Sequence, residues 1–168
     1  MERQPLKYCA IILTKDNSVR LPHKNYLYIK DKQVWEYVRD ALSNYRVYDF
    51  HQNINRPKNA SRPDEPIWQA LKWAYKSIGE EYDAVINIMA NCPMITSKDV
   101  EKAVKRFEQL GCQELRSFNE DGSESGLMIV KTDYLLNKHE VSTYQGAITI
   151  NSIEIHTKQD LEKCRLNL

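Results

Sequence analysis

Two short apolar runs constrain the fold of this 168-residue chain more than any other feature. Residues 6–13 read LKYCAIIL and residues 83–89 read DAVINIM, and neither run alternates as a half-exposed strand does. Nearly continuous apolar strands of this length are typical of sheets that are covered on both faces, as parallel sheets are. We therefore expect a layered protein built around a largely buried sheet.

Amphipathic segments lie between and after these runs. In residues 33–45 and 67–78 the apolar side chains recur at helical spacing, and a third such segment opens at Thr96 or Ser97 and ends before Gly111. We expect helices at 33–45, 67–78, 97–110 and from 157 onward, and further strands at 114–118, 127–131, 146–150 and 152–156. This alternation predicts an α/β fold, a three-layer α/β/α sandwich with a mostly parallel, Rossmann-like sheet.

Length and charge limit what the chain can do. A chain of 168 residues fits one domain, here residues 1–168. Lys and Arg number 24 and Asp and Glu number 23, so no overall field would attract nucleic acid or an anionic membrane. Any anion site must therefore be local, and we expect neither nucleic acid nor a membrane as a partner.

Cysteine spacing and hydropathy indicate the compartment. The sequence has no C-x-x-C pair, so zinc or redox chemistry is not indicated. The first residues lack the features of a signal peptide, and no apolar run approaches the length of a membrane span. We expect a cytoplasmic protein with reduced thiols at its four cysteines, Cys9, Cys92, Cys112 and Cys164.

A basic loop follows the first apolar run directly. Lys15, Arg20 and Lys24 stand in LTKDNSVRLPHKN, residues 13–25, against one acid, Asp16. In open α/β sheets ligands bind at the carboxyl ends of strands, so this loop lies where phosphates are usually received. The alternative interpretation is a solvated loop with ordinary surface charges.

The string VRLPHKN, between the apolar strand and YLYIKDKQVWEYV, resembles the nucleotide-binding signature of the cytidylyltransferases that make CMP-activated acidic sugars. That signature reads roughly A-R-x-G-S-K-R-L-P-x-K-N, followed by G-K-P-L and a helix. The chain departs from it where Lys15 replaces the first Arg, Asp16 and Asn17 replace glycine-rich sequence, and Val19 replaces Lys. The matching residues are Ser18, Arg20, Leu21, Pro22, Lys24 and Asn25, with Lys32 at the Lys of G-K-P.

The second apolar run continues the resemblance. In MANCPMI the ending Pro93, Met94, Ile95 is similar to the P-L-I of G-D-x-P-L-I in these nucleotidyltransferases. Asn91 stands at the position of the acid that helps to hold the metal, although Mg²⁺ prefers anionic oxygen. Cys92 is expected to be a small packing residue and not a nucleophile.

The C-terminal segment GAITINSIEIHTKQDL resembles a compressed form of the family's last strands, N-G-A-I-Y-I and D-I-D-T-P-E-D-L. Glu154 and His156 stand at the two acids, and their alternation would put both on one face of a strand. In the alternative interpretation this is an exposed strand edge, and Thr157 and Asp160 only cap a helix.

The resemblance implies a nucleotide-diphospho-sugar transferase-like fold and full or weak transfer of CMP from CTP to an acidic sugar with release of pyrophosphate, in polysaccharide biosynthesis. It implies a nucleoside triphosphate and a small acidic sugar as partners, Mg²⁺ as cofactor and a homodimer as one assembly, although residues 114–144 are too short for the family's dimer insertion. The implied catalytic residues are Lys15, Arg20 and Lys24; the nucleotide-binding residues are Leu13, Thr14, Ser18, Asn25, Ala90 and Asn91; the metal ligands are Asn91 and Glu154. A catalytically impaired nucleotide- or sugar-binding homologue and an interaction module that uses only the fold remain alternatives.

Overall fold

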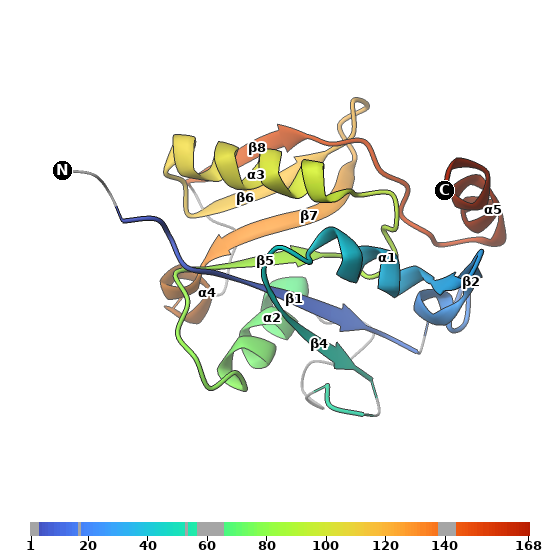
Figure 1. The fold of residues 1–168 in the computed structure, drawn as a ribbon, viewed down its shortest axis with the longest axis horizontal. Coiled ribbons are helices and arrows are strands. Elements are labelled where there is room, and N and C mark those ends of the chain that lie inside the picture. The colour runs from blue at the N-terminus through green and yellow to red at the C-terminus, as the bar shows by residue number, and fades with distance from the viewer. Residues whose placement is uncertain (1–3, 17, 53, 57–65, 138–143) are drawn as a thin grey trace.

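The computed structural model describes residues 4–16, 18–52, 54–56, 66–137 and 144–168, which form a six-stranded sheet and a small two-stranded one (Figure 1). The large sheet has the order β4-β1-β5-β7-β6-β8. Its strand β7 runs antiparallel to both of its neighbours, and the other pairs are parallel. The strands are β1 (Tyr8–Thr14), β4 (Arg46–His51), β5 (Ala84–Ile88), β6 (Glu114–Phe118), β7 (Glu124–Lys131) and β8 (Gln145–Thr149).

Helices cover both faces of the sheet, which confirms the predicted three-layer α/β/α architecture. One apolar core packs α1 and α3 against the sheet, and a second packs α2 and α4 against the other face. The helices are α1 (Val34–Ala41), α2 (Ile67–Lys76), α3 (Ser97–Leu110), α4 (Thr132–Asn137) and α5 (Lys158–Asn167). None of them, within the described part of the chain, is both long and apolar enough to cross a membrane.

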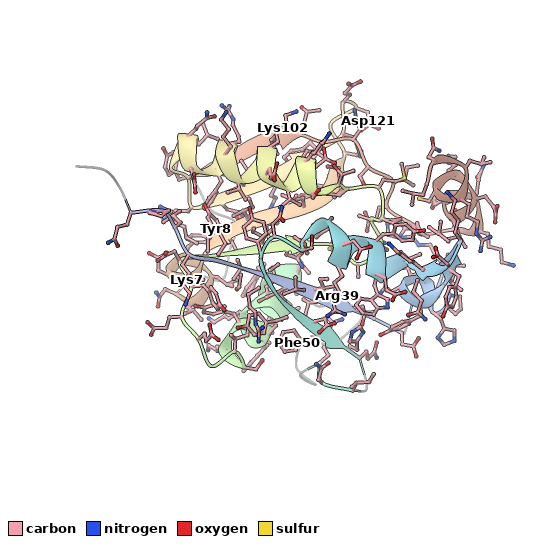
Figure 2. The ribbon with its side chains drawn as sticks, viewed as in Figure 1. Lys7, Tyr8, Arg39, Phe50, Lys102 and Asp121 are labelled. Carbon is pink, nitrogen blue, oxygen red and sulfur yellow. The ribbon has the colours of Figure 1, made fainter. Side chains whose placement is uncertain are left out.

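Helix α3 shows how the sequence pattern determines the packing. Val100, Ala103 and Phe107 are buried, whereas Lys102 lies exposed on the same helix (Figure 2). The predicted cap is confirmed, because Thr96 Oγ1 accepts a hydrogen bond from the Asp99 N–H at 3.3 Å. The helix therefore begins where the loop after β5 ends.

A third, smaller core lies beside the carboxyl ends of β1 and β5 and includes α5 (Figure 1). It joins Leu21 of the basic loop to Ile155 and to Leu161 of α5. The hairpin of β2 (Tyr28–Ile29) and β3 (Lys32–Gln33) packs here through Ile29. The basic loop and the segment before α5 thus rest on one apolar cluster.

Two predicted elements were wrong in extent or type. Residues 152–156 form no strand, because the chain leaves the sheet after β8 and Ile155 pairs only with the single residue Asn91. The first helix ends at Ala41 and not at Tyr45, because the Leu42 and Ser43 N–H groups bond three residues back, to Arg39 and Asp40. Strand β4, the β2-β3 hairpin and α4 were not predicted.

Candidate functional site

The basic loop is held by polar contacts at its two ends. Asn25 Nδ2 donates to the Lys15 carbonyl at 3.2 Å, which ties the end of the loop to its beginning. Asp16 pairs with the His23 ring across the loop. His23, and not a glycine, takes the left-handed conformation with φ of 58°. Side-chain hydrogen bonds therefore replace the expected glycine-rich turn, although Asn17 lies outside the described residues.

Thr14 supports the loop from behind. Its fully buried hydroxyl lies 2.7 Å from the Tyr26 hydroxyl and 3.0 Å from His51 Nδ1. The His51 Nε2 faces Asp49 at 3.5 Å. Thr14 was predicted to bind nucleotide, but its side chain is turned to this network and is not among the residues that line the cavity described next.

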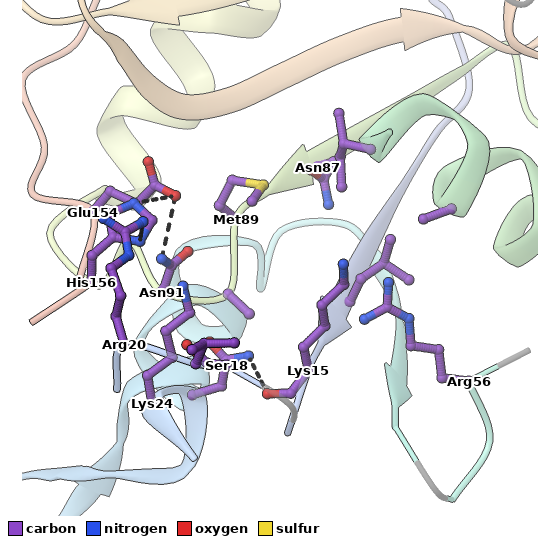
Figure 3. A pocket seen from close by; sticks show the side chains of 16 residues that line it. Lys15, Ser18, Arg20, Lys24, Arg56, Asn87, Met89, Asn91, Glu154 and His156 are labelled. Carbon is purple, nitrogen blue, oxygen red and sulfur yellow. Dashed lines mark hydrogen bonds and ion pairs between the residues drawn. The ribbon is translucent and has the colours of Figure 1, made fainter. Parts of the chain in front are cut away.

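A cavity of about 340 Å³ opens at the carboxyl ends of β1 and β5 (Figure 3). It brings together every other residue that the sequence predicted for the site. Those residues are Leu13, Lys15, Ser18, Arg20, Lys24, Asn25, Ala90, Asn91 and Glu154, together with His156.

The cavity is strongly cationic. Among the described residues that line it, Lys15, Arg20, Lys24 and Arg56 carry positive charge and Glu154 carries the single carboxylate. Burial lowers the pKa of Lys24, and the nearby Glu154 opposes this shift. An anion in the cavity would restore the stability of the charged ammonium, so the site favours a polyanionic ligand.

Arg56 is a site residue that sequence reasoning missed. Its guanidinium is buried and donates from Nη1 to the Thr14 carbonyl at 2.7 Å, at the end of β1. It belongs to the segment 46–62, which departs from the family and offered no motif; residues 57–62 lie outside the described part.

Asn87 was missed as well, although a signal existed. It is a buried amide in the apolar run DAVINIM, and its Nδ2 donates to the Ile11 carbonyl at 2.8 Å. A polar residue inside an apolar strand must have a partner, so its presence marks a place where the sheet has a special contact. Here that place is the wall of the cavity.

The wall opposite the basic loop is built from the end of β5 and the segment before α5. Asn91 Nδ2 donates to the Ile155 carbonyl at 3.0 Å and lies 3.4 Å from Glu154 Oε1. The same carboxylate oxygen is 3.0 Å from His156 Nε2. Arg20 Nη2 is 3.0 Å from His156 Nδ1, and because a guanidinium only donates, Nδ1 accepts and Nε2–H points to Glu154. Arg20 thus connects the two walls.

The donor set fits a metal ion only in company with other ligands. The described residues contain no group of three or more His, Cys, Asp or Glu side chains placed to hold a metal. Glu154 offers one anionic oxygen, and the Asn91 oxygen is turned away from Glu154 (Figure 3). Mg²⁺ commonly binds through one or two carboxylates plus substrate phosphates and water, so these residues suit an ion that arrives with a nucleotide.

Cys92 does not provide a nucleophile. Its thiol is completely buried, and burial raises its pKa well above the usual range. This agrees with the packing role expected for it. All four cysteines lie in the described part, and each is buried with a free thiol.

Comparison with known proteins establishes the class of fold. No family model and no curated protein matches the sequence. Solved structures do match, and they show that the chain has a cytidylyltransferase-like fold of the nucleotide-diphospho-sugar transferase type, at identities of 8–16% that mark it as divergent.

Three of these structures are informative. A CMP:2-keto-3-deoxy-manno-octonic acid synthetase complexed with CTP aligns with a TM-score of 0.76 and 15% identity over 96% of this chain and 98% of its own. A cytidylyltransferase from Leptospira borgpetersenii aligns with a TM-score of 0.71 and 16% identity over 96% and 86%. Rv0371c from Mycobacterium tuberculosis, in complex with manganese, aligns with a TM-score of 0.61 and 11% identity over 96% and 100%.

Proposed function

We propose that the protein is a nucleotidyltransferase that transfers CMP from CTP to the hydroxyl of a small acidic sugar. The observation that carries this proposal is the convergence of Lys15, Arg20, Lys24 and Arg56 on one cavity at the carboxyl ends of parallel strands. The fold supports it, because similar structures include a synthetase bound to CTP. The buried free thiols support a reducing compartment such as the cytoplasm. A homodimer remains a prediction.

The reaction requires positioning and neutralisation of charge. The acceptor hydroxyl oxygen attacks the α-phosphorus, the bond from that phosphorus to the bridging oxygen of the β-phosphate breaks, and pyrophosphate leaves. The hydroxyl proton passes to solvent. In our assignment Lys15, Arg20 and Lys24 hold the triphosphate, and Arg56 adds a fourth cation from the other side of β1.

Leu13, Ser18, Asn25 and Ala90 would surround the rest of the nucleotide, since they line the same cavity. Mg²⁺ that arrives with the nucleotide would be held by Glu154 and, through water, by the Asn91 oxygen, and when bound it would neutralise charge on the phosphates. Because Glu154 is the single carboxylate among the described residues that line the cavity, we expect slow turnover.

Thermal unfolding tests the proposal. The protein is melted with CTP, UTP, GTP and ATP, each with and without Mg²⁺, and pyrophosphate release is then assayed with sialic-acid-like and ulosonic acids. A ligand at about 100 times its Kd adds roughly 2.7 kcal/mol to stability, a shift of about 5–10 °C in a domain of this size. A shift with CTP and release of pyrophosphate are expected; no shift with any nucleotide contradicts the proposal.

A second candidate is a nucleotide- or sugar-binding protein without catalytic activity. The single carboxylate in the cavity and the neutral amide of Asn91 favour it. It predicts a thermal shift with nucleotide but no pyrophosphate with any acceptor. An interaction module that uses only the fold predicts no shift, and the presence of four cations in the lining of one cavity speaks against it.

A further inference from the structure

Asn91 makes an unusual contact with the segment that carries Glu154 and His156. The Ile155 N–H donates to the main-chain carbonyl of Asn91 at 2.9 Å, and the Asn91 side-chain Nδ2 donates to the Ile155 carbonyl at 3.0 Å. One residue therefore satisfies both backbone groups of Ile155, as a neighbouring strand would, although the segment is not part of the sheet. Asn91 is almost completely buried, with 2% of its surface exposed.

The contact sets the direction of two side chains at the cavity. Ile155 is fully buried in the third core, between Glu154 and His156, which both line the cavity. Fixing the backbone of Ile155 thus turns Glu154 and His156 toward the basic loop. The Asn91 amide also faces the Glu154 carboxylate directly, at 3.4 Å.

An acid could not make this contact. A carboxylate has no N–H to donate to the Ile155 carbonyl, and it would face the Glu154 carboxylate across the same short distance. Two carboxylates so placed repel each other unless a cation lies between them. With an amide at position 91, hydrogen bonds alone join this residue to Ile155 and Glu154.

We propose that Asn91 is a positioning residue that fixes the Ile153–His156 segment at the cavity, so that this wall takes its place without a divalent ion. The ion is then needed only when the nucleotide brings it. The consequence for nucleotide binding rests on the proposed function, whereas the consequence for the protein alone does not.

The variant Asn91→Asp tests the inference without nucleotide. We expect its unfolding midpoint to fall in chelator and to recover with millimolar Mg²⁺ or Mn²⁺, because the ion then joins Asp to Glu154. The wild-type midpoint should be the same in chelator and in metal. Asn44→Asp is the matched control, since the Asn44 amide faces Glu101 at 3.5 Å on the exposed surface, and it should show neither effect.

Two further variants separate the local effect from a general loss of folding. Asn91→Asp with Glu154→Gln removes the repulsion, so it should fold in chelator and lose the metal response. Asn91→Ala should release the segment without creating a metal site. The variant Asn91→Ala keeps the main-chain acceptor of the Ile155 N–H but loses the bond from Nδ2 that holds the segment against it. The segment should therefore open more often, and the Ile155 N–H should exchange roughly 10-fold faster or more than in the wild type, in chelator and metal alike.

Nucleotide binding is measured separately, by titrating CTP into the wild type in chelator and in Mg²⁺. Tighter binding of CTP in Mg²⁺, together with an unliganded midpoint that metal does not change, supports the inference. A wild-type midpoint that rises by several degrees with metal alone, or an Ile155 exchange rate unchanged in Asn91→Ala, would overturn it. If CTP does not bind in either buffer, the proposed function fails, and the metal and exchange results still decide the role of Asn91.

Discussion

The two walls of the cavity, the basic loop and the segment with Asn91, Glu154 and His156, differ in how closely they match the signature of the resembling family. The basic loop lacks the glycines of the resembling signature, yet its residues Lys15, Arg20 and Lys24 line the cavity. Arg56, which follows β4, lines it as well. The opposite wall lines the same cavity but presents Asn91 and His156 where the resembling family has acids. Convergent cations and a metal-binding acid pair are therefore separable, because cations need only a common direction whereas Mg²⁺ needs anionic oxygens.

The largest loss of stability is expected at Gly126, which packs against Cys92 in the wall opposite the basic loop. Gly126 has φ of 101°, and a Cβ there would lie 2.4 Å from Cys92 Sγ, next to Asn91. Overpacking and the unfavourable φ together should cost Gly126→Ala about 2–5 kcal/mol of stability, measured by denaturant unfolding. Gly122→Ala is the control, with φ of 86° but no atom within 4 Å. Equal losses in both variants would show that Cys92 exerts no packing constraint.

Arg20 tests the link between the walls. Arg20→Ala removes the proposed phosphate contact and the contact with His156, so CTP binding should weaken about 10-fold or more in calorimetric titration. Arg20→Lys should recover part of the loss, since it keeps the charge but not the planar fork. Arg106→Ala, on the exposed side of α3, provides the matched control. If Arg20→Ala binds CTP as tightly as the wild type does, Arg20 contacts only His156 and does not bind the nucleotide.

The lowered pKa of Lys24, in the basic loop, predicts how CTP affinity depends on pH. Burial lowers its pKa below 10.5, so CTP affinity should fall as pH rises through that lowered pKa, earlier than for an ordinary lysine. The stability of the protein without nucleotide should rise over the same pH range, because burying the neutral amine costs less free energy than burying the ammonium. Burial raises the pKa of Tyr26, so its titration is shifted away from that of Lys24, whose pKa is lowered. An affinity that stays constant up to pH 10.5 would contradict this account of Lys24.

The smallest loss of stability is expected at the cap of α5, which follows the segment with Glu154 and His156. Thr157 Oγ1 accepts from the Asp160 N–H at 3.2 Å and caps α5, directly after His156. Thr157→Ala should cost about 1 kcal/mol, or about 2–4 °C in the unfolding midpoint. Thr157→Ser keeps the hydroxyl and should keep the stability. A loss that is the same for Ala and Ser would locate the effect in the methyl group instead.

Much of the fold follows from local patterns in the sequence. Continuous apolar runs predict β1 and β5, and capping residues predict where α3 and α5 begin, because these features depend on neighbours in the chain. Strand β4 has mixed polarity, since it lies at the edge of the sheet, and its pairing with β1 is a property of the whole fold. Residues 152–156 have the alternation of a strand, but the backbone and side chain of the single residue Asn91, and not a strand, pair with Ile155.

The motifs predicted several of the residues that line the cavity, whereas their roles remain a prediction. The R-L-P-x-K-N string located Arg20, Lys24 and Asn25 at the cavity because the strand before it fixes where the loop begins. Arg56 belongs to no motif, and its approach to the Thr14 carbonyl depends on the course of the chain after β4. The burial of Thr14 could not be predicted either, because its partners Tyr26 and His51 come from two other segments.

The most direct test of the central claim is a calorimetric titration of CTP into the wild type, Lys24→Ala and Lys102→Ala. The account predicts saturable binding to the wild type and to Lys102→Ala, whose exposed lysine lies on α3, and binding weakened about 10-fold or more in Lys24→Ala with an unchanged fold. Equal affinity in all three proteins, or no heat of binding in any, would contradict it.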